Sequence, residues 1–231
     1  MIYTEAELQA LIHTLYEADT DTPASTDEDY LIRRKYLNMG IAFWETWRGV
    51  KWKELYTTLD DVSTGATTTI LTGATQANCP TSLVDTLGFV QVVDSSNNAV
   101  NYLEVKQHEW QMYIRGSSTA KVYCLTGKPG AYKINWYPTM SSEDNGKSIK
   151  YPYYKRATMI TATTDTPEPS DHTFLIHYTL SWLYKEEDAG RSREQLDIAI
   201  NLLNGMKLNN DMDKPYQDLS IYDKLGSGFG V

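Results

Sequence analysis

The sequence predicts an α+β protein: a helical bundle of about four helices, an inserted antiparallel β-sandwich or barrel domain and an extended C-terminal arm. Three observations predict this class. Apolar side chains recur at helical spacing over residues 1–55, alternate with a period of two over 56–160, and return to helical spacing over 161–207. Residues 208–231 are polar and irregular, and we expect an arm that only a partner orders. The β domain is therefore expected to lie between helices that pack together.

The first helix is expected over Thr4–Glu17. Thr4 and Glu7 have the capping-box spacing, in which each side chain satisfies the backbone amide of the other residue. The apolar stripe at i, i+3, i+4 and i+7 consists of Leu8, Leu11, Ile12 and Leu15. A stripe of this width predicts that one face of the helix packs on a partner helix.

A second, longer helix is expected from about Asp27 to Trp47, capped by Ser25 or Asp27 and ended by Gly49. The core candidates on its buried face are Leu37, Ile41 and Trp44. Three indole rings, those of Trp44, Trp47 and Trp52, gather where the helix ends. We expect them to anchor the helix to the segment that follows.

The middle of the chain reads as short strands rich in Val, Ile, Thr and Tyr, separated by turn residues. The candidate strands are Thr67–Leu71, Gly88–Val93, Val100–Val105, Trp110–Ile114, Ala120–Leu125 and Ala131–Trp136. Ile149–Tyr154 contains Pro152, which predicts an edge strand or an extended segment, because proline has no amide to donate. Short strands at close spacing favour a small sandwich or barrel.

Helical spacing returns after a Pro/Thr-rich linker over residues 161–170. A helix is expected from Ser170 or Asp171 to about Asp188, a break at Gly190, and a last helix over Ser192–Lys207. The core candidates on these two helices are Tyr178, Trp182 and Leu203. The stripe of the last helix is formed by Leu196, Ala199, Ile200, Leu203 and Met206. Two helices joined by a short loop predict an antiparallel hairpin.

The charge and the cysteines exclude several classes of protein. The formal net charge of −9 is opposite to that of DNA-binding domains, which neutralise phosphates with Lys and Arg. Two cysteines, Cys79 and Cys124, are too few for a disulfide framework and lack the spacing of a zinc site. No signal peptide and no membrane span are recognised, and we expect synthesis in the cytoplasm.

The sequence predicts no catalytic site, no metal and no cofactor, and therefore a protein that is not an enzyme. His172 and His177 are five residues apart, which does not match the i, i+4 spacing of a helical zinc pair. No phosphate-binding loop, dinucleotide fingerprint or nucleophile elbow is present. The paired acids Asp60-Asp61, Glu143-Asp144 and Glu186–Asp188 fall in turns or at a helix end, where solvated charge is usual.

Several stretches, taken in order, resemble one family. They are Tyr3–Leu8, the helix exit through Trp44 and Trp47, Asp165–Pro169, Leu175–Tyr178 and Trp182–Asp188 followed by a last helix. Their order and spacing resemble the head-to-tail adaptors, or connectors, of tailed bacteriophages, including the tubular tail-ring proteins. The resemblance covers most of the chain, and the β region is its least specific part.

The resemblance implies a structural virion protein at the neck, assembled in the host cytoplasm. Members form a ring, typically dodecameric, whose arm binds the portal ring and whose β domain faces a downstream tail or nozzle protein. DNA passes through the lumen without sequence-specific binding, and no membrane is involved. Carried onto this chain, the portal-binding candidates are Tyr216, Leu219, Ile221, Tyr222 and Phe229. Adaptor, stopper and tail-tube terminator roles remain open.

Two other functions compete with this interpretation. The first is a carbohydrate-binding β-sandwich module of a virion or secreted protein, with Trp110, Tyr113, Tyr132 and Trp136 as stacking platforms for sugar rings. The second is a hydrolase that uses the scattered carboxylates. The flanking helices have no role in the first, and the second lacks a recognisable motif.

Overall fold

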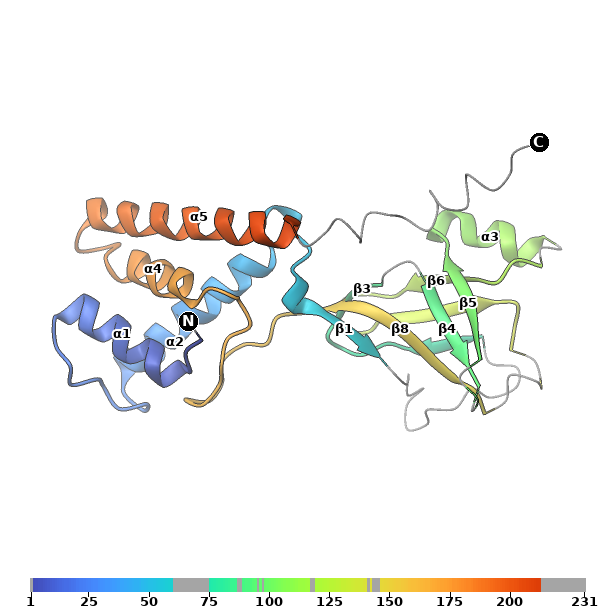
Figure 1. Ribbon diagram of the computed structural model, residues 1–231, viewed down its shortest axis with the longest axis horizontal. Helices are drawn as coiled ribbons and strands as arrows, with labels where there is room; N and C mark the ends of the chain where they lie inside the picture. Colours follow the sequence, from blue (N-terminus) through green and yellow to red (C-terminus); the bar gives the residue numbers. More distant parts are fainter. Residues whose placement is uncertain are drawn as a thin grey trace. The chain divides into compact units, whose positions relative to one another are not determined.

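The computed structural model confirms an α+β protein (Figure 1). It describes residues 2–59, 75–86, 89–94, 98–116, 119–140 and 146–212, together with the single residues 96 and 142. The chain forms two compact units, which are described separately below. The helical unit comprises residues 1–54 and 157–231, and the β unit comprises residues 55–156. Among the described helices, none has the length and apolar character needed to cross a membrane.

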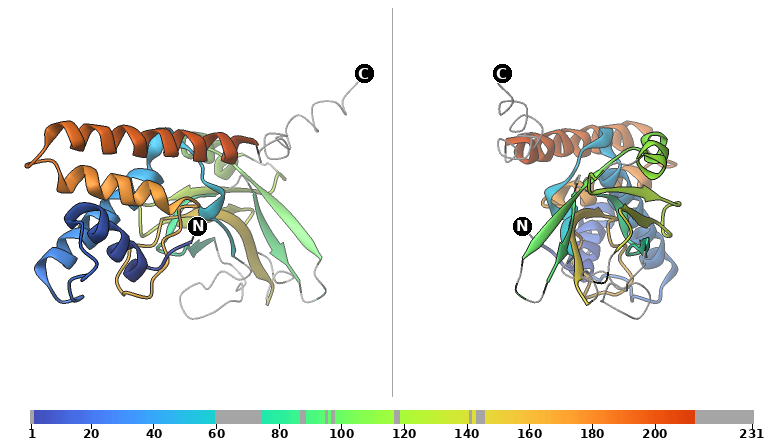
Figure 2. Two further views of the ribbon diagram at one scale, coloured as in Figure 1. Left: turned by 60° about the vertical axis from the view of Figure 1, so that its left-hand side comes forward. Right: turned by 90° about the vertical axis from the view of Figure 1, so that its right-hand side faces the viewer.

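The described residues of the helical unit form four helices, and these come from both ends of the chain. They are α1 (Glu5–Glu17), α2 (Glu28–Glu45), α4 (His172–Leu183) and α5 (Ala189–Met212). Short 3-10 turns follow α2 at Trp47–Gly49 and Lys53–Leu55. In both views α4 and α5 lie side by side, and α4 also packs against α1 and α2 (Figures 1 and 2). Helices that precede the β unit thus share a core with helices that follow it.

The predicted capping box at the start of α1 is confirmed. The Thr4 hydroxyl accepts a hydrogen bond from the Glu7 amide, and the Glu7 carboxylate accepts one of 2.7 Å from the Thr4 amide. Of the predicted apolar stripe, Leu8 and Ile12 are fully buried. Leu15, in the last turn, is 55% exposed.

The prediction that Gly190 breaks the chain between two helices is wrong, because α5 begins at Ala189 and includes it. The Asp188 carboxylate accepts hydrogen bonds from the amides of Gly190 and Arg191, at 2.9 and 3.0 Å. Since these amides are unpaired in a first helical turn, Asp188 allows α5 to start three residues before the predicted Ser192.

Both long helices end at points that differ from the predicted ones. α2 stops at Glu45, and the backbone turns through positive φ angles at Arg48 and Gly49. α5 continues to Met212, five residues beyond Lys207, so the segment expected to be an extended arm begins as helix. The rest of the predicted arm, residues 213–231, lies outside the described residues.

In the described part of the β unit, eight strands form one curled sheet (Figure 2). They are β1 (Tyr56–Leu59), β2 (Gln76–Asn78), β3 (Leu83–Thr86), β4 (Phe89–Val93), β5 (Ala99–Glu104), β6 (Val122–Thr126), β7 (Lys133–Tyr137) and β8 (Ser148–Lys155). The order is β1-β8-β4-β5-β6-β7-β2, with β3 paired to β8. The predicted strand Thr67–Leu71 lies outside the described residues.

The predicted strand Trp110–Ile114 is wrong, because this segment lies in a helix, α3 (Gln107–Arg115). β5 and β6 pair in parallel, and parallel neighbours need a crossover rather than a hairpin. α3 supplies that crossover. Trp110 and Tyr113, three residues apart, pack on Val105, Val122 and Cys124. Their spacing places both residues on one face of a helix. The parallel pairing of β5 with β6 decides that this segment forms a helix, with its period of 3.6 residues, and not a strand, with its period of two.

The prediction that Pro152 marks an edge is also wrong, since β8 lies between β1 and β4. On one side of β8, β4 pairs with Ser148 to Lys150 and β3 pairs with Tyr153 to Lys155. Neither strand has a register partner for Pro152. On this side, Pro152 therefore lies opposite the point where the sheet changes from β4 to β3, and on the other side its register partner is Thr58 of β1.

The β unit has an aromatic and aliphatic core. It contains Leu83, Val90, Val92, Tyr102, Tyr123, Ile134, Trp136, Ile149 and Tyr151, each at most 3% exposed. One polar cluster lies within it: the Tyr123 hydroxyl bonds to Thr86 Oγ1 at 2.9 Å and to a Glu104 carboxylate oxygen at 3.1 Å. Burial raises the pKa of Tyr123 far above its ordinary value, so the phenol stays protonated.

Candidate functional site

In the helical unit, α2 and α4 approach each other closely, and this approach determines which side chains of the two helices are available for function. Gly40 makes this contact possible. A Cβ atom at Gly40 would lie 3.0 Å from both Leu175 Cδ2 and Tyr178 Cδ1. Because no side chain separates the two helices at this point, the larger residues on either side of Gly40 can meet those of α4.

Two stacked aromatic pairs join α2 to α4 on either side of this contact. The Phe43 and Tyr178 rings are 5.2 Å apart with an interplanar angle of 27°, and the Tyr36 and Trp182 rings are 5.8 Å apart at 19°. Offset pairs of this kind contribute roughly 0.5–1.5 kcal/mol each beyond their buried area. They fix the register of α2 against α4.

The six residues predicted as the bundle core divide into two groups. Leu37, Ile41, Trp44, Tyr178 and Leu203 are buried. Trp182 is only half buried. The Trp44 ring also stacks on Trp52 at 5.3 Å, and Trp52 Nε1 donates a 2.7 Å hydrogen bond to the Trp44 carbonyl.

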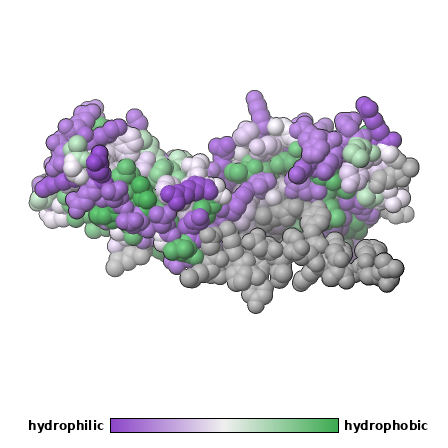
Figure 3. Space-filling view, turned by 90° about the horizontal axis from the view of Figure 1, so that it is seen from above, coloured by the Kyte–Doolittle hydropathy of each residue, from purple (hydrophilic) through white to green (hydrophobic). Residues whose placement is uncertain are grey.

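Trp182 is half buried because it lines a groove between α4 and α5. The groove encloses about 320 Å³ and is lined by Phe43, Tyr178, Ser181, Trp182, Lys185, Ser192, Leu196 and Ile200. Of the stripe predicted on the last helix, Ala199, Leu203 and Met206 are buried, whereas Leu196 and Ile200 are only partly covered. The apolar stripe of α5 is therefore wider than the part that the core buries, and Leu196 and Ile200 leave an apolar surface. Figure 3 shows hydrophobic side chains reaching the surface among hydrophilic ones.

A second hollow, of about 460 Å³, lies on the outer side of α2. It is lined mainly by apolar groups, with Arg34 and Lys35 at its side: Leu31, Arg34, Lys35, Asn38, Met39, Ala42 and Met159. Leu31 is 47% exposed and Met159 is 38% exposed. Exposed aliphatic side chains beside an apolar hollow are typical of protein-binding surfaces.

Buried charges hold the N-terminal helix in place. Glu5 is fully buried, and its two carboxylate oxygens accept hydrogen bonds from Arg34 Nε at 2.6 Å and Arg34 Nη2 at 2.8 Å. Arg33, which is 2% exposed, bonds to His13 Nδ1 at 2.8 Å and approaches the Glu17 carboxylate at 3.4 Å. Each of these pairs joins α1 to α2, so the contacts have a structural role.

His172 ties the N-terminal segment to the linker before α4. Its Nδ1 accepts a 2.8 Å hydrogen bond from the Tyr3 amide, and its Nε2 lies 3.0 Å from the Pro167 carbonyl, to which it donates. Only the neutral imidazole makes both bonds. Burial lowers the pKa of His172, which keeps the ring neutral. A histidine of this kind is a structural connection and not a metal ligand.

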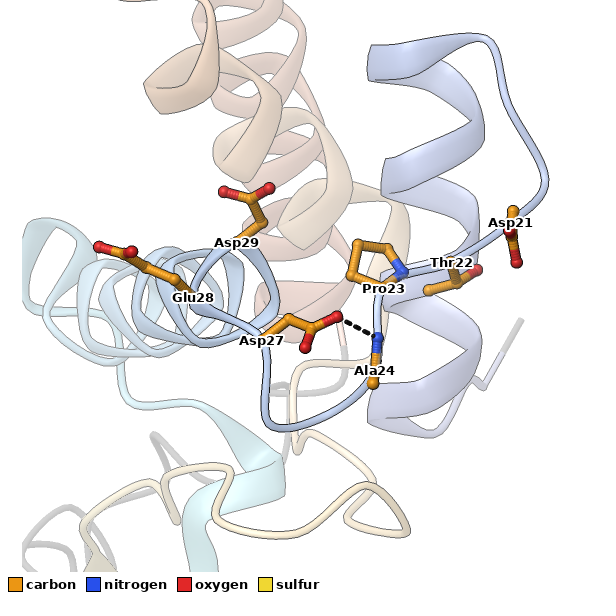
Figure 4. Close-up of a pocket in the computed structure, with 7 residues that line it drawn as sticks. All are labelled: Asp21, Thr22, Pro23, Ala24, Asp27, Glu28 and Asp29. Carbon is orange, nitrogen blue, oxygen red and sulfur yellow. Dashed lines mark hydrogen bonds between the residues drawn. The ribbon is translucent and has the colours of Figure 1, made fainter.

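The acidic loop between α1 and α2 borders a third hollow (Figure 4). Asp21, Asp27, Glu28 and Asp29 line it, but their carboxylates point in different directions. The Asp27 carboxylate accepts a 2.8 Å hydrogen bond from the Ala24 amide and so stabilises the loop. Carboxylates that diverge cannot share a cation or act as an acid–base pair.

Chemical groups with catalytic or metal-binding potential do not gather in the described part of the chain. No group of three His, Cys, Asp or Glu side chains there is placed to hold a metal ion. Cys79 and Cys124 are free thiols, and burial raises the pKa of both. Of the predicted carboxylate runs, Glu186–Asp188 is exposed between α4 and α5, and the other two lie outside the described residues.

The four aromatics considered as sugar platforms serve the core of the β unit. Trp136 is 3% exposed and lies inside the sheet core, against which Tyr132 packs. Trp110 and Tyr113, on α3, pack against Val105, Val122 and Cys124. Of the four rings, that of Trp136 is buried, whereas those of Trp110, Tyr113 and Tyr132 are partly exposed, so sugar binding stays a prediction.

The portal-binding candidates Tyr216, Leu219, Ile221, Tyr222 and Phe229 lie outside the described residues. The groove between α4 and α5 was not recognised from the sequence. The sequence does contain a signal for this groove. Ala199 and Leu203 already form an apolar stripe, and Leu196 and Ile200 make it wider. Comparison with known proteins finds no family model that matches the chain and no curated protein that matches it.

Proposed function

We propose that this chain is a structural virion protein that forms the adaptor ring between the portal and the tail of a bacteriophage. The observation that carries the proposal is the discontinuous helical unit, built from residues 1–54 and 157–212 around an inserted β unit. An insertion gives each subunit two distinct layers, one for its neighbours in the ring and one for the next component. Head-to-tail contacts between identical subunits close into a ring when the rotation allows it.

In this proposal the four helices are the bundle layer that packs subunit to subunit. Exposed aliphatic groups support this role: Leu31 and Ile32 on α2 and Met159 beside it are 47%, 37% and 38% exposed. The curled sheet is the sandwich-like or barrel-like layer that faces the downstream tail or nozzle protein. The arm after α5 reaches the portal ring, and a dodecamer is the expected stoichiometry.

The charge supports passage of DNA through the ring. The chain carries 30 acidic and 21 basic residues. An acidic lumen repels phosphates, so DNA slides past without being held. The protein then works in the virion neck as a mechanical part that needs neither a cofactor nor a membrane.

The test is electron microscopy of the full-length chain mixed with its portal ring. A fourfold variant with Tyr216, Leu219, Ile221 and Tyr222 changed to serine removes the proposed arm contacts. A cut after Lys207 is a poor choice, because residues 208–212 belong to α5 and Asn210 bonds to the backbone of Lys51 and Lys53 at 2.9 Å. Leu208→Ser, at a 62% exposed position on α5, is the matched control.

We expect a ring of this protein seated on the portal with the full-length chain and with the control, and no seated ring with the fourfold variant. Full-length chain that stays monomeric beside an intact portal would contradict the adaptor function. Rings that seat equally well with the fourfold variant would leave the adaptor function standing and remove these four residues from the portal contact.

A further inference from the structure

Two surfaces of the helical unit are complementary in polarity and charge. We propose that the end of α1 in one copy of the chain, with Leu15 at its centre, docks in the α2 hollow of a second copy, where Lys35 pairs with Glu186 or Glu187 of the first. The same contact repeats from copy to copy. Its place in a ring rests on the proposed function, which the contact deepens by naming the surfaces through which subunits meet.

The hollow on the outer side of α2 combines apolar side chains with positive charge. Leu31 and Met159, which line it, are 47% and 38% exposed. The charged residues among those that line it are Arg34 and Lys35. Arg34 is held by the buried Glu5 carboxylate, whereas Lys35 is exposed and forms no ion pair within the described residues. The Lys35 ammonium is therefore available to a carboxylate of another molecule.

This positive charge lies in the more acidic of the two units. Of the 30 acidic residues of the chain, 22 belong to the helical unit, which has only 12 of the 21 basic residues. Two helical units therefore repel each other in most orientations. The hollow around Lys35 is a place where a carboxylate of a second copy is attracted, and such a difference selects one orientation of approach.

The matching surface is the end of α1, beside the connection from α4 to α5 (Figure 1). Leu15, in the last turn of α1, is 55% exposed. The Tyr184 hydroxyl donates a 3.3 Å hydrogen bond to the Leu15 carbonyl, and the Tyr16 and Tyr184 rings are 5.1 Å apart. Glu186 and Glu187 follow Tyr184 directly and are exposed. An exposed aliphatic side chain thus lies in the same small region as two exposed carboxylates.

Contacts within the chain hold this region in place before a partner binds. Tyr16 donates a hydrogen bond to Glu187, and burial together with this carboxylate raises the pKa of Tyr16 to about 12, so the phenol keeps its proton. The Glu17 carboxylate lies 3.4 Å from Arg33 of α2. Asp188 accepts hydrogen bonds from two amides in the first turn of α5. Because these contacts already order the region, docking costs little conformational entropy.

The two surfaces lie on different sides of the helical unit. Leu31 and Arg33 are two residues apart on α2, which is about 200° around a helix of 3.6 residues per turn. Arg33 contacts Glu17 at the end of α1, so the hollow that Leu31 lines faces away from that end. A contact between unlike surfaces leaves each copy one free surface, and it therefore continues to a third copy. Such a contact closes into a ring when the rotation between copies allows it.

Sedimentation velocity of the full-length chain, without portal, tests the contact with three matched variants. Leu15→Asp, Leu31→Asp and Leu208→Asp each place a carboxylate at an exposed leucine. We expect the unaltered chain and Leu208→Asp to self-associate as their concentration rises. Leu15→Asp and Leu31→Asp should each weaken self-association by about tenfold or more, because the new charge enters the apolar part of the contact.

A mixture of Leu15→Asp and Leu31→Asp keeps one intact surface on each partner. The first variant retains the hollow and the second retains the end of α1. We expect the mixture to form dimers that grow no further, whereas contacts between like surfaces would not be restored by mixing. A mixture that stays monomeric, or Leu15→Asp that self-associates as strongly as the unaltered chain, overturns the proposal.

An exchange of charges tests the ion pair itself. Lys35→Glu alone, and Glu186→Lys with Glu187→Lys, should each weaken self-association, and all three changes in one chain should restore it. Restoration also shows that the altered chains fold. A chain with the three changes that associates no better than Lys35→Glu alone overturns the pairing of Lys35 with these carboxylates.

The outcome is separate from that of the adaptor test, because sedimentation is measured without portal. Association that depends on Leu15 and Leu31, without seating on the portal, would support this contact and contradict the adaptor function. Rings of Leu15→Asp that seat normally on the portal would support the adaptor function and overturn this contact. An unaltered chain that stays monomeric at every concentration also overturns the contact.

Discussion

The helical unit and the β unit bury different kinds of side chain. Of the buried polar and charged residues among those described, all but Thr86 belong to the helical unit. They are Glu5, Gln9, His13, Arg33, His172, Thr179, Ser181 and Asn210. The core of the β unit is instead built from aliphatic and aromatic groups.

This difference follows from how the two units are assembled. The strands of the β unit are linked by backbone ladders, which satisfy their own polar groups. The helical unit joins segments from the two ends of the chain, and helices satisfy their backbones internally, so side chains must specify the pairing. A buried ion pair specifies which helices pair, because each charge needs one particular partner. Removing one partner leaves the other charge buried and uncompensated.

The largest expected effect is on the apolar core of the helical unit. Trp44→Ala removes a fully buried ring that stacks on Trp52, and we expect a loss of about 3–5 kcal/mol in the free energy of unfolding. Amide exchange should accelerate in α2 and α4 and stay slow in β4 and β8. Equal acceleration in both units would show that they do not unfold as separate bodies.

The next largest effect tests the role of buried charge. Glu5→Gln keeps the shape of a fully buried side chain but leaves Arg34 without its carboxylate, and we expect a loss of roughly 2–3 kcal/mol in urea denaturation. Glu7→Gln, on the same helix, is the control: its side chain is exposed and the glutamine oxygen can still accept the hydrogen bond from the Thr4 amide, so the loss should be much smaller. A smaller loss for Glu5→Gln than for Glu7→Gln would contradict the idea that buried charges specify how the helices pair.

Two helix glycines offer a matched pair with opposite signs. Gly40→Ala meets Leu175 and Tyr178 at 3.0 Å, so α2 and α4 must separate, and we expect a loss of about 1–3 kcal/mol. Gly205→Ala in α5 meets nothing within 4 Å, and we expect a gain of up to about 1 kcal/mol from helix propensity. Thermal unfolding of the two variants checks both signs, and a neutral Gly40→Ala would mean that the aromatic pairs do not depend on this approach.

The smallest expected effect is a dependence on pH. The folded-state pKa of His172 is lowered from the ordinary value of about 6.5, so the unfolded chain binds its proton more readily. The stability that the neutral ring provides is therefore complete above about pH 6.5 and falls as the pH drops through the folded-state pKa.

Exchange of the N-terminal segment, measured between pH 5 and 8, should show this dependence. His172→Asn keeps an acceptor near the Tyr3 amide and should flatten the curve. His108→Asn, at an exposed position on α3, should leave it unchanged. A curve of the same slope in His172→Asn would assign the dependence to another group.

The sequence by itself determined the elements whose signals are local. The capping box of Thr4 and Glu7 lies within one turn of chain, and it places the start of α1 correctly. The apolar stripes of α2 and α5 and the alternation in β4 to β7 likewise depend on near neighbours. Leu37, Ile41, Trp44 and Leu203 are recognisable as core for the same reason.

Only the tertiary structure decided what depends on distant partners. The segment around Trp110 and Tyr113 is a helix because β5 and β6 pair in parallel and need a crossover. Pro152 lies inside the sheet, between β1 and the point where β4 and β3 meet. The groove at Leu196 exists because α4 covers less of α5 than the apolar stripe offers. Spacing along a chain shows which side chains can share a face, whereas the fold decides how much of that face is covered.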